Sequence, residues 1–262
     1  MGRKYELTDE TREVYGHTLY RIVAVRSFGN IEKGAKGGWI EKESNLNHEG
    51  LCWIYGDAEV FEDAVVSDNA EVWGFARVFG NAAVYGDANV FFRAQVYSDA
   101  RVHDSATVHG NAVVFHNAEV CGNAEVFHND EVCGSAKVYG NADVYDNARV
   151  CGYSLIHSNA NVCGSAQVCD NAEVCGDAEV SGEAALLGFA VVSSDEDYIV
   201  FKNWWSSGRY FTWTRSNNKW CVGCFYGTGD ELIRKAYKDS EKSGREYERI
   251  VRYVEEILKA DK

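Results

Sequence analysis

One six-residue phrase repeats through the middle of this chain and constrains what the chain can fold into. A small residue, almost always alanine, stands at every sixth position from Ala58 to Ala190, and an aliphatic residue follows two places later from Val60 to Val192. These positions make 23 consecutive hexads without an insertion or deletion. A period this strict predicts a stacked architecture, because one repeat cannot bury its apolar face without its neighbours.

The spacing within each hexad predicts short strands separated by sharp turns. Residues two apart in an extended strand point to the same side, so the alanine and the aliphatic residue both face inward. The residue between them varies freely, as Glu59, Arg77 and Lys137 illustrate, which indicates an outward position. Gly-Asn or Gly-Asp then turns the chain. We expect three hexads to close one triangular coil and successive coils to pair as parallel strands.

This pattern resembles the hexapeptide repeat of left-handed parallel β-helices, in which an inward small residue precedes an inward aliphatic residue by two positions. The resemblance covers residues 38–193 and implies a mainly β fold with about eight coils of three hexads each. It departs from the family in one respect, because glycine falls two residues after the aliphatic residue. The handedness of the coils is implied by the resemblance and not by the periodicity.

Two segments without the repeat flank the coils. Residues 1–37 are expected to form an N-terminal cap with a strand at 20–25, followed by one irregular coil with a loop at 47–51. Residues 194–262 predict a small C-terminal α+β domain, with strands at 198–203, 209–214 and 219–225. Capping boxes at Thr228 with Glu231 and at Ser243 with Glu246 predict two helices that end near residues 242 and 260.

The flanking segments add a second resemblance. Gly37-Gly38-Trp39-Ile40-Glu41 before the coils and the run from Val222 to Gly229 after them are similar to segments of uncharacterised prophage-encoded hexapeptide-repeat proteins. That resemblance implies a phage protein but no established activity.

Negative charge is concentrated on the repeat. Residues 56–193 hold twenty acidic and five basic residues, a net charge of −15, whereas the whole chain carries −14. Such a surface repels nucleic acid and attracts basic partners. The sequence contains no secretory or membrane-spanning pattern, so we interpret the nine cysteines as reduced thiols. We therefore expect a cytoplasmic protein without a membrane contact, in the host cell if a phage encodes it.

Histidines are the candidate catalytic groups. The best known hexapeptide-repeat enzymes are acyltransferases that use acyl-CoA and a histidine general base, usually at a trimer interface. The resemblance implies His103, His109 and His157 as bases under this hypothesis. However, no loop interrupts residues 58–192, and these histidines occupy slots that hold tyrosine, phenylalanine or cysteine elsewhere. The pattern therefore favours no catalytic residue and no cofactor.

Metal binding is also not expected. The zinc carbonic anhydrases built on this type of helix need three histidines that converge between subunits, and the histidines here fall on different faces or corners. Cys221 and Cys224 form a lone CxxC that we assign to packing. Asp130 takes an inward alanine position, which predicts a local distortion of the corner rather than catalysis.

The slot after each aliphatic residue recurs on the same face once per coil and therefore predicts three outward ladders, rich in aromatic residues and cysteine. Exposed aromatic rows often mark interfaces, so we expect another subunit or the C-terminal domain to cover at least one ladder. The turn pattern is broken twice in adjacent coils, and large residues at a turn that favours glycine imply strain. This corner is the predicted binding site, and its members are Trp73, Phe75, Phe91, Phe92 and Arg93.

Three functions follow as hypotheses. The first is a non-catalytic binding or scaffold protein that acts through its acidic surface on a basic host protein, for example as a phage-encoded inhibitor. The second is an acyl-CoA-dependent acyltransferase, with a trimer implied by analogy. The third is a sponge that sequesters a small nucleotide between subunits, using the C-terminal basic residues Lys202, Arg209, Arg215 and Lys219.

Overall fold

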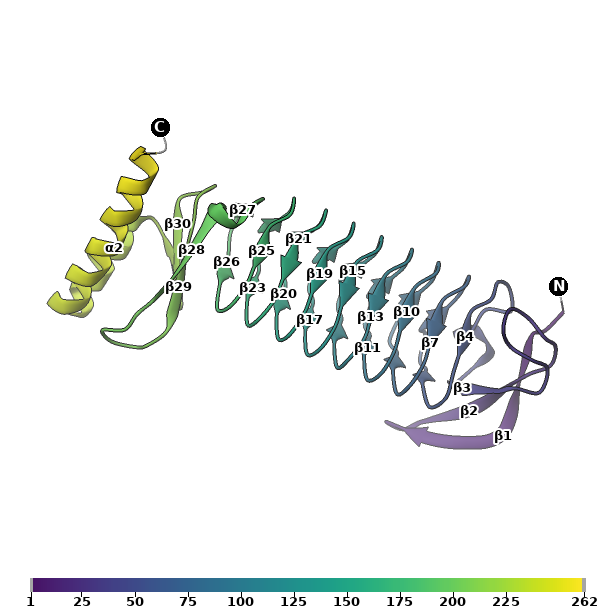
Figure 1. Cartoon of the computed structure of the whole chain (residues 1–262). Helices are drawn as coiled ribbons and strands as arrows, with labels where there is room; N and C mark the ends of the chain where they lie inside the picture. The colour runs from purple at the N-terminus through teal and green to yellow at the C-terminus, as the bar shows by residue number, and fades with distance from the viewer. Residues whose placement is uncertain (1, 261–262) are drawn as a thin grey trace.

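The computed structural model describes residues 2–260 and shows an elongated body with a cap at each end (Figure 1). The body is a parallel β-helix of about nine turns. Each strand pairs with the strand one coil away, so that Val60 lies opposite Val78 and Val78 lies opposite Val96. The predicted coil of three hexads is therefore confirmed.

Three sheets form the sides of the β-helix, and nearly all of their strands within the coils are two residues long. Sheet I contains β1 (Tyr5–Val14), β2 (His17–Ala24), β3 (Lys36–Ile40), β5 (Glu59–Val60), β8 (Arg77–Val78), β11 (Gln95–Val96), β14 (Val113–Val114), β17 (Glu131–Val132), β20 (Arg149–Val150), β23 (Gln167–Val168) and β26 (Ala185–Leu186). Sheet II contains β4 (Trp53–Ile54), β7 (Glu71–Val72), β10 (Asn89–Val90), β13 (Thr107–Val108), β16 (Glu125–Val126), β19 (Asp143–Val144), β22 (Asn161–Val162) and β25 (Glu179–Val180). Sheet III contains β6 (Val65–Val66), β9 (Ala83–Val84), β12 (Arg101–Val102), β15 (Glu119–Val120), β18 (Lys137–Val138), β21 (Leu155–Ile156), β24 (Glu173–Val174) and β27 (Val191–Val192).

The core of the coils is made of the repeated alanine and aliphatic residues, which are almost completely buried, as predicted. The first turn residue takes the left-handed backbone conformation, for example Gly80 with φ 71° and Gly110 with φ 72°. The asparagines that follow stack in amide ladders, and Asn123 Nδ2 donates to Asn141 Oδ1 at 2.9 Å. Glycine provides many of these turns, other residues such as Asp68 and His116 take the same conformation with φ 57° and 59°, and asparagine ties one turn to the next.

An irregular coil precedes the regular ones, as predicted. β3 pairs with β5, Leu46 forms a parallel bridge with Val66, and β4 pairs with β7. A 3-10 helix (Glu43–Asn45) lies between β3 and the bridge. The extra residues of this coil form the segment between Leu46 and β4, where the loop was expected.

The N-terminal cap is a β-hairpin that continues sheet I. β2 contains most of the predicted strand at 20–25, but β1 was not predicted, because charged residues dominate its sequence. Tyr15 and Gly16 form the hairpin turn, with φ values of 51° and 87°. The hairpin covers Phe61 at the start of one outward ladder, which leaves that ring 1% exposed. We expected the C-terminal domain or another subunit to cover a ladder, so the hairpin is an unexpected cover.

The C-terminal cap is a four-stranded antiparallel sheet with two helices on the side away from the coils (Figure 1). Its elements are η2 (Asp195–Asp197), β28 (Tyr198–Lys202), β29 (Tyr210–Thr214), β30 (Lys219–Val222), β31 (Phe225–Gly227), α1 (Gly229–Asp239) and α2 (Glu241–Ala260). Among the described residues, neither helix is both long and apolar enough to cross a membrane.

Two details of the C-terminal prediction were wrong. The strand expected at 219–225 is two strands, because Gly223 adopts φ 58° and turns the chain between β30 and β31. The capping box at Thr228 is present, but the second helix begins earlier than Ser243. The Ser240 hydroxyl accepts the Ser243 amide at 3.1 Å and so caps α2 one turn sooner.

The cysteines include one disulfide, between Cys151 and Cys169. These two residues occupy the same slot in neighbouring coils, with a Cα–Cα separation of 4.6 Å. The prediction that all cysteines are reduced thiols is wrong for this pair, because the coil stacking brings the two side chains together.

Candidate functional site

The outward ladders contain stacks of parallel rings, and the longest runs along the ladder that follows sheet II. On the ladder that follows sheet II, Trp73 lies 4.2 Å from Phe91 between ring centroids, and Phe91 lies 4.7 Å from His109. The stack continues to Phe127 and Tyr145 at 5.1 and 5.2 Å. The rings are within 12° of parallel, which is the offset stacking that aromatic pairs favour. The ladders thus stabilise the coil spacing as well as forming a surface.

The three candidate histidine bases lie within these ladders, and each is paired with a glutamate of the next coil. The Nε2–Oε1 distances are 2.9 Å for His103 with Glu119, 2.7 Å for His109 with Glu125, and 3.0 Å for His157 with Glu173. The structure does not bring the three histidines together: His103 and His157 share one ladder three coils apart, and His109 belongs to another. A general base would therefore have to act alone with its glutamate.

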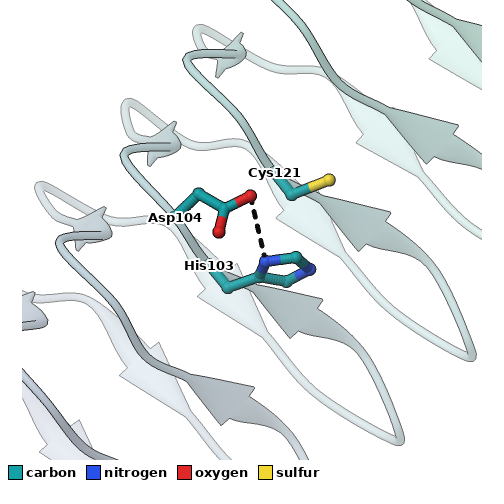
Figure 2. A group of neighbouring side chains, drawn as sticks. All are labelled: His103, Asp104 and Cys121. Carbon is teal, nitrogen blue, oxygen red and sulfur yellow. Dashed lines mark ion pairs between the residues drawn. The ribbon is translucent and has the colours of Figure 1, made fainter.

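Cysteine joins histidine at one of these positions (Figure 2). Cys121 follows His103 by one coil, and Asp104 Oδ2 lies 3.4 Å from His103 Nδ1. The amide of Gly122 and the His103 side chain lower the pKa of Asp104, and burial raises the pKa of Cys121. The metal site considered from the sequence was a trio of histidines, and this group mixes histidine, aspartate and cysteine. Its signal was a histidine and a cysteine three hexads apart.

The predicted binding corner presents two exposed phenylalanines. Phe75 is 62% exposed and Phe92 is 52% exposed, whereas Trp73 and Phe91 are partly buried in the stack beneath. The Phe92 ring lies 5.0 Å from Phe91 and 5.6 Å from Trp73. Phe92 has φ 57°, so the expected backbone strain is present there. Phe75 avoids it, because Gly74 takes the left-handed position.

A shallow groove runs beside this corner. Its volume is about 410 Å³, and it is lined by Phe75, Arg77, Arg93, Gln95 and Asn111. Phe75 and Arg93 interrupt the ladder of turn amides that resumes at Asn111, whose side chain bonds Asn129 at 3.0 Å. The described residues give Arg93 no ion-pair partner, although the surrounding coils are strongly acidic. The groove is thus an aromatic and cationic interruption in an acidic surface.

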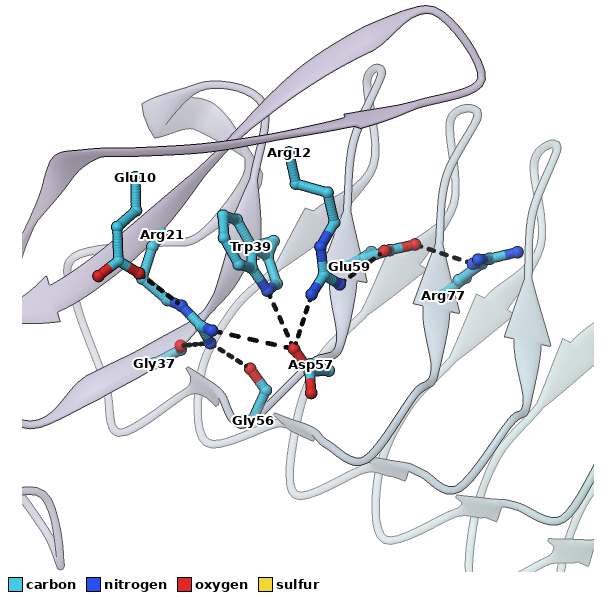
Figure 3. Close-up of polar contacts among 9 residues, drawn as sticks. All are labelled: Glu10, Arg12, Arg21, Gly37, Trp39, Gly56, Asp57, Glu59 and Arg77. Carbon is cyan, nitrogen blue, oxygen red and sulfur yellow. Dashed lines mark hydrogen bonds and ion pairs between the residues drawn. The ribbon is translucent and has the colours of Figure 1, made fainter.

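The N-terminal hairpin fixes one side of the groove through a network of ion pairs (Figure 3). Arg77 Nε lies 2.8 Å from Glu59 Oε2, and its Nη1 donates to the hydroxyl of Tyr15 at 2.9 Å. Arg12 bonds the other Glu59 oxygen at 3.1 Å and Asp57 at 2.8 Å. The bond from Arg12 lowers the pKa of Asp57. Arg77 is therefore held in place, and Arg93 is the arginine of the groove that remains available.

Asp130 is buried in the core, but the predicted distortion of its corner is wrong. β17 keeps its register with β14 and β20, so the coil continues unchanged around the carboxyl. One carboxyl oxygen accepts the Ala148 amide at 2.8 Å, and the other has no hydrogen-bond partner among the described residues. Burial raises the pKa of Asp130 to about 7. Because the group lies inside the coil with no exposed surface, it cannot reach a substrate.

The basic residues of the sponge hypothesis lie in the C-terminal cap. Lys202 lies on the edge strand β28, with its Nζ 5.3 Å from the centre of the Tyr210 ring. Lys219 begins β30, and Arg209 directly precedes β29. These residues belong to a different part of the molecule from the groove of Phe75 and Arg93.

Comparison with known proteins supports the fold and adds one functional hint. A family model described as the YdcK β-solenoid repeat matches residues 94–110. The chain is a parallel β-helix repeat protein. A curated relative named "Uncharacterized acetyltransferase YdcK", from Escherichia coli (strain K12), is 38% identical to this β-helix protein over 76 residues. The match spans 26% of the chain and 23% of the relative's length.

Proposed function

We propose that this β-helix protein is a non-catalytic binding scaffold whose acidic coils hold a basic protein partner. The observation that carries the proposal is the charge of residues 56–193, which hold twenty acidic and five basic residues; of the acidic side chains, only Glu59 and Asp130 are buried. Opposite charges speed association and select partners, although exposed pairs add little affinity one by one. The narrower form of the proposal is that a phage encodes this chain and that the chain inhibits a basic protein of the host cell.

The exposed corner of Phe75 and Phe92 supplies the apolar contact that charge alone lacks. Aromatic anchors dominate the energy of most protein interfaces, whereas rim charges mainly set the rate and the partner. Both rings lie at turns of the coil beside the stacked rings of Trp73 and Phe91, and both are exposed to solvent. A basic partner that also presents an apolar patch fits this combination.

Affinity purification from a cell lysate, followed by titration of the recovered partner, tests this proposal. We expect a basic protein whose binding weakens steeply with salt, because exposed charges are screened. The double variant F75A/F92A should weaken binding by roughly tenfold or more. F189A is the matched control, since Phe189 is 75% exposed at a turn of another corner. Equal loss in the control, or a partner bound independently of salt, would contradict the proposal.

A second candidate is acyl transfer, and it rests on the name of the partial relative and on the histidine–glutamate pairs. A glutamate on one ring nitrogen fixes the orientation of the imidazole and leaves the other nitrogen to face an acceptor. Under this function we expect consumption of acetyl-CoA by a trimer. The single variants H103Q, H109Q and H157Q should identify one histidine whose loss abolishes turnover. If all three variants retain the rate, or the wild type has none, acyl transfer by these histidines is excluded.

A further inference from the structure

The outward ladder that follows sheet III has a second period. It receives one residue from every coil, and its order of residue types repeats every three coils. The slots that follow sheet III read Tyr85, His103, Cys121 and then Tyr139, His157, Cys175. Each member of the second trio lies nine hexads, and therefore three coils, after its counterpart in the first. The tyrosine ring stacks on the histidine ring in both copies, at 4.7 and 4.9 Å. The same order of tyrosine, histidine and cysteine thus occurs twice on one face. The carboxylate differs between the copies: Asp104 follows the first histidine, whereas Ser158 takes that place in the second copy and Glu173, the counterpart of Glu119, supplies the carboxylate.

Each copy gathers three different ligand groups. In the first, one atom each of His103, Asp104 and Cys121 lie within 4.8 Å of one another, and in the second the same holds for His157, Glu173 and Cys175. Figure 2 shows the first group, with the imidazole and the carboxylate on one coil and the sulfur on the next. Ligand atoms of a tetrahedral zinc site lie roughly 3.3–3.8 Å apart. Small rotations of exposed or partly exposed side chains close the difference.

We propose that these two groups are paired binding sites for a divalent transition metal of the zinc type. Imidazole and thiolate select zinc over calcium or magnesium, and the carboxylate completes a three-residue set of the kind that leaves one position open. Glu119 holds His103 Nε2 at 2.9 Å and is the outer-shell carboxylate of the first site. The negative charge of the coils concentrates cations at both sites.

Neighbouring ladders show that the combination is not a by-product of the repeat. His109 has the same kind of glutamate partner, Glu125, but Phe127 stands where a cysteine would be needed. Cys163 lies 4.0 Å from Glu179, but Tyr145 precedes it in the ladder instead of a histidine. Among the described residues, histidine followed by cysteine one coil later occurs in the ladder after sheet III and in neither of the other two ladders.

Titration of the full chain with Co²⁺ under a phosphine reductant tests the proposal. We expect a thiolate-to-cobalt charge-transfer band that saturates at two equivalents and disappears when Zn²⁺ is added. C121S and C175S should each remove one equivalent and halve the band, and the double variant should remove both. E119Q should weaken the first site roughly 10–100-fold and leave the second unchanged.

C163S and H109Q are the matched controls, and both should retain two equivalents. Circular dichroism of every variant should match the wild type, since all of these changes lie at outward positions of the coil. Metal bound without a thiolate band would indicate nonspecific attraction to the acidic coils and would overturn the proposal. A band that survives in the double variant C121S/C175S would assign the metal to other cysteines and overturn it as well.

Discussion

The two ends of the β-helix are closed in different ways. At the N-terminal end, β2 pairs with β3 through the backbone, so the hairpin is part of sheet I. At the C-terminal end, the described strands of the four-stranded sheet share no pairing with the coils, and side chains make the contacts. Asp195 accepts the Glu179 amide, Thr212 accepts the Ala185 amide and Ser216 accepts the Val191 amide, at 2.7–2.8 Å.

This difference follows from what each cap contributes of its own. The C-terminal cap has a separate core around Trp213, Trp220 and Val251, and it adds to the coils only Tyr198 and Val200 at the end of their core and acceptors for the last coil's free amides. The hairpin has no such core, because Tyr5 and Ile22 belong to the core of the coils. We infer that the hairpin unfolds together with the coils and that the C-terminal cap unfolds separately.

The largest expected effect is a loss of stability in the C-terminal cap that leaves the coils unchanged. Trp213 is fully buried in the C-terminal core, and W213A should lower the stability of that cap by about 3–5 kcal/mol. The helical circular dichroism signal should be lost at lower denaturant, while the coil transition stays where it is. W204A, which removes a ring that is 70% exposed, should change neither transition. A single shared transition in W213A would contradict the separation of the two parts.

The buried carboxyl of Asp130 should affect the stability of the coils but not that of the C-terminal cap. Because the pKa of Asp130 is raised to about 7, the folded coil holds a proton that the unfolded chain releases near pH 4. The stability that this proton provides is full below pH 4 and is lost as the pH rises through 7. D130A restores the alanine of the repeat and should stabilise the coil transition at pH 8 by roughly 2–4 kcal/mol.

Chemical unfolding of D130A at several pH values measures this effect. The gain should shrink toward pH 4, and the helical transition of the C-terminal cap should not move. E131A, which changes the adjacent outward carboxylate, should show no comparable gain at pH 8. If D130A unfolds with the same pH dependence as the wild type, Asp130 does not titrate as described.

The N-terminal end of the coils should be more sensitive than the C-terminal end to the loss of a single basic side chain. Arg12 bridges the hairpin to Asp57 and to Glu59, whose side chain is 6% exposed. R12M keeps an unbranched apolar side chain but removes these bonds and the guanidinium that lies 4.4 Å from the centre of the Trp39 ring, and should lower coil stability by roughly 1–3 kcal/mol. R101M, at an exposed site on β12, is the control and should be neutral. An unchanged coil midpoint in R12M would show that the hairpin adds nothing to the coils.

The smallest effect concerns a single hydrogen bond at the other end. T212V removes the hydroxyl that accepts the Ala185 amide at 2.8 Å and should cost about 1 kcal/mol. Hydrogen exchange at Ala185 should become faster in this variant. T214V is the control, because the Thr214 hydroxyl bonds Asn217 within its own cap. Equal exchange at Ala185 in both variants would mean that the contact does not protect the coil end.

The coils could be predicted because their information is local and repeated. Alanine at one position and valine two places later specify an inward face in every hexad, and 23 hexads leave no other register. β1 was missed because its strand pattern is hidden by charged residues, although Tyr15-Gly16 was a readable hairpin turn. The second helix start was missed by one turn, since two serines both suit a cap.

The candidate sites were less predictable because they depend on which residues meet across coils. The exposed corner of Phe75 and Phe92 could be found as a break in the turn pattern. The disulfide of Cys151 and Cys169 required the coil length and also a judgement that two stacked thiols react. The groups around Cys121 and Cys175 required a search for mixed ligands at that spacing instead of one residue type.

Because each coil is triangular in cross-section, the number of hexads determines how the C-terminal cap is rotated about the long axis relative to the N-terminal hairpin. Each hexad advances the chain by one side of the triangle, so the count between β3 and β28 determines which face of the C-terminal cap lies in line with the N-terminal hairpin. An insertion of three hexads lengthens the body and preserves that alignment. An insertion of one hexad keeps every inward residue inward but turns the C-terminal cap by a third of a revolution. The length of the repeat therefore sets both how far apart the two caps lie and which way they face.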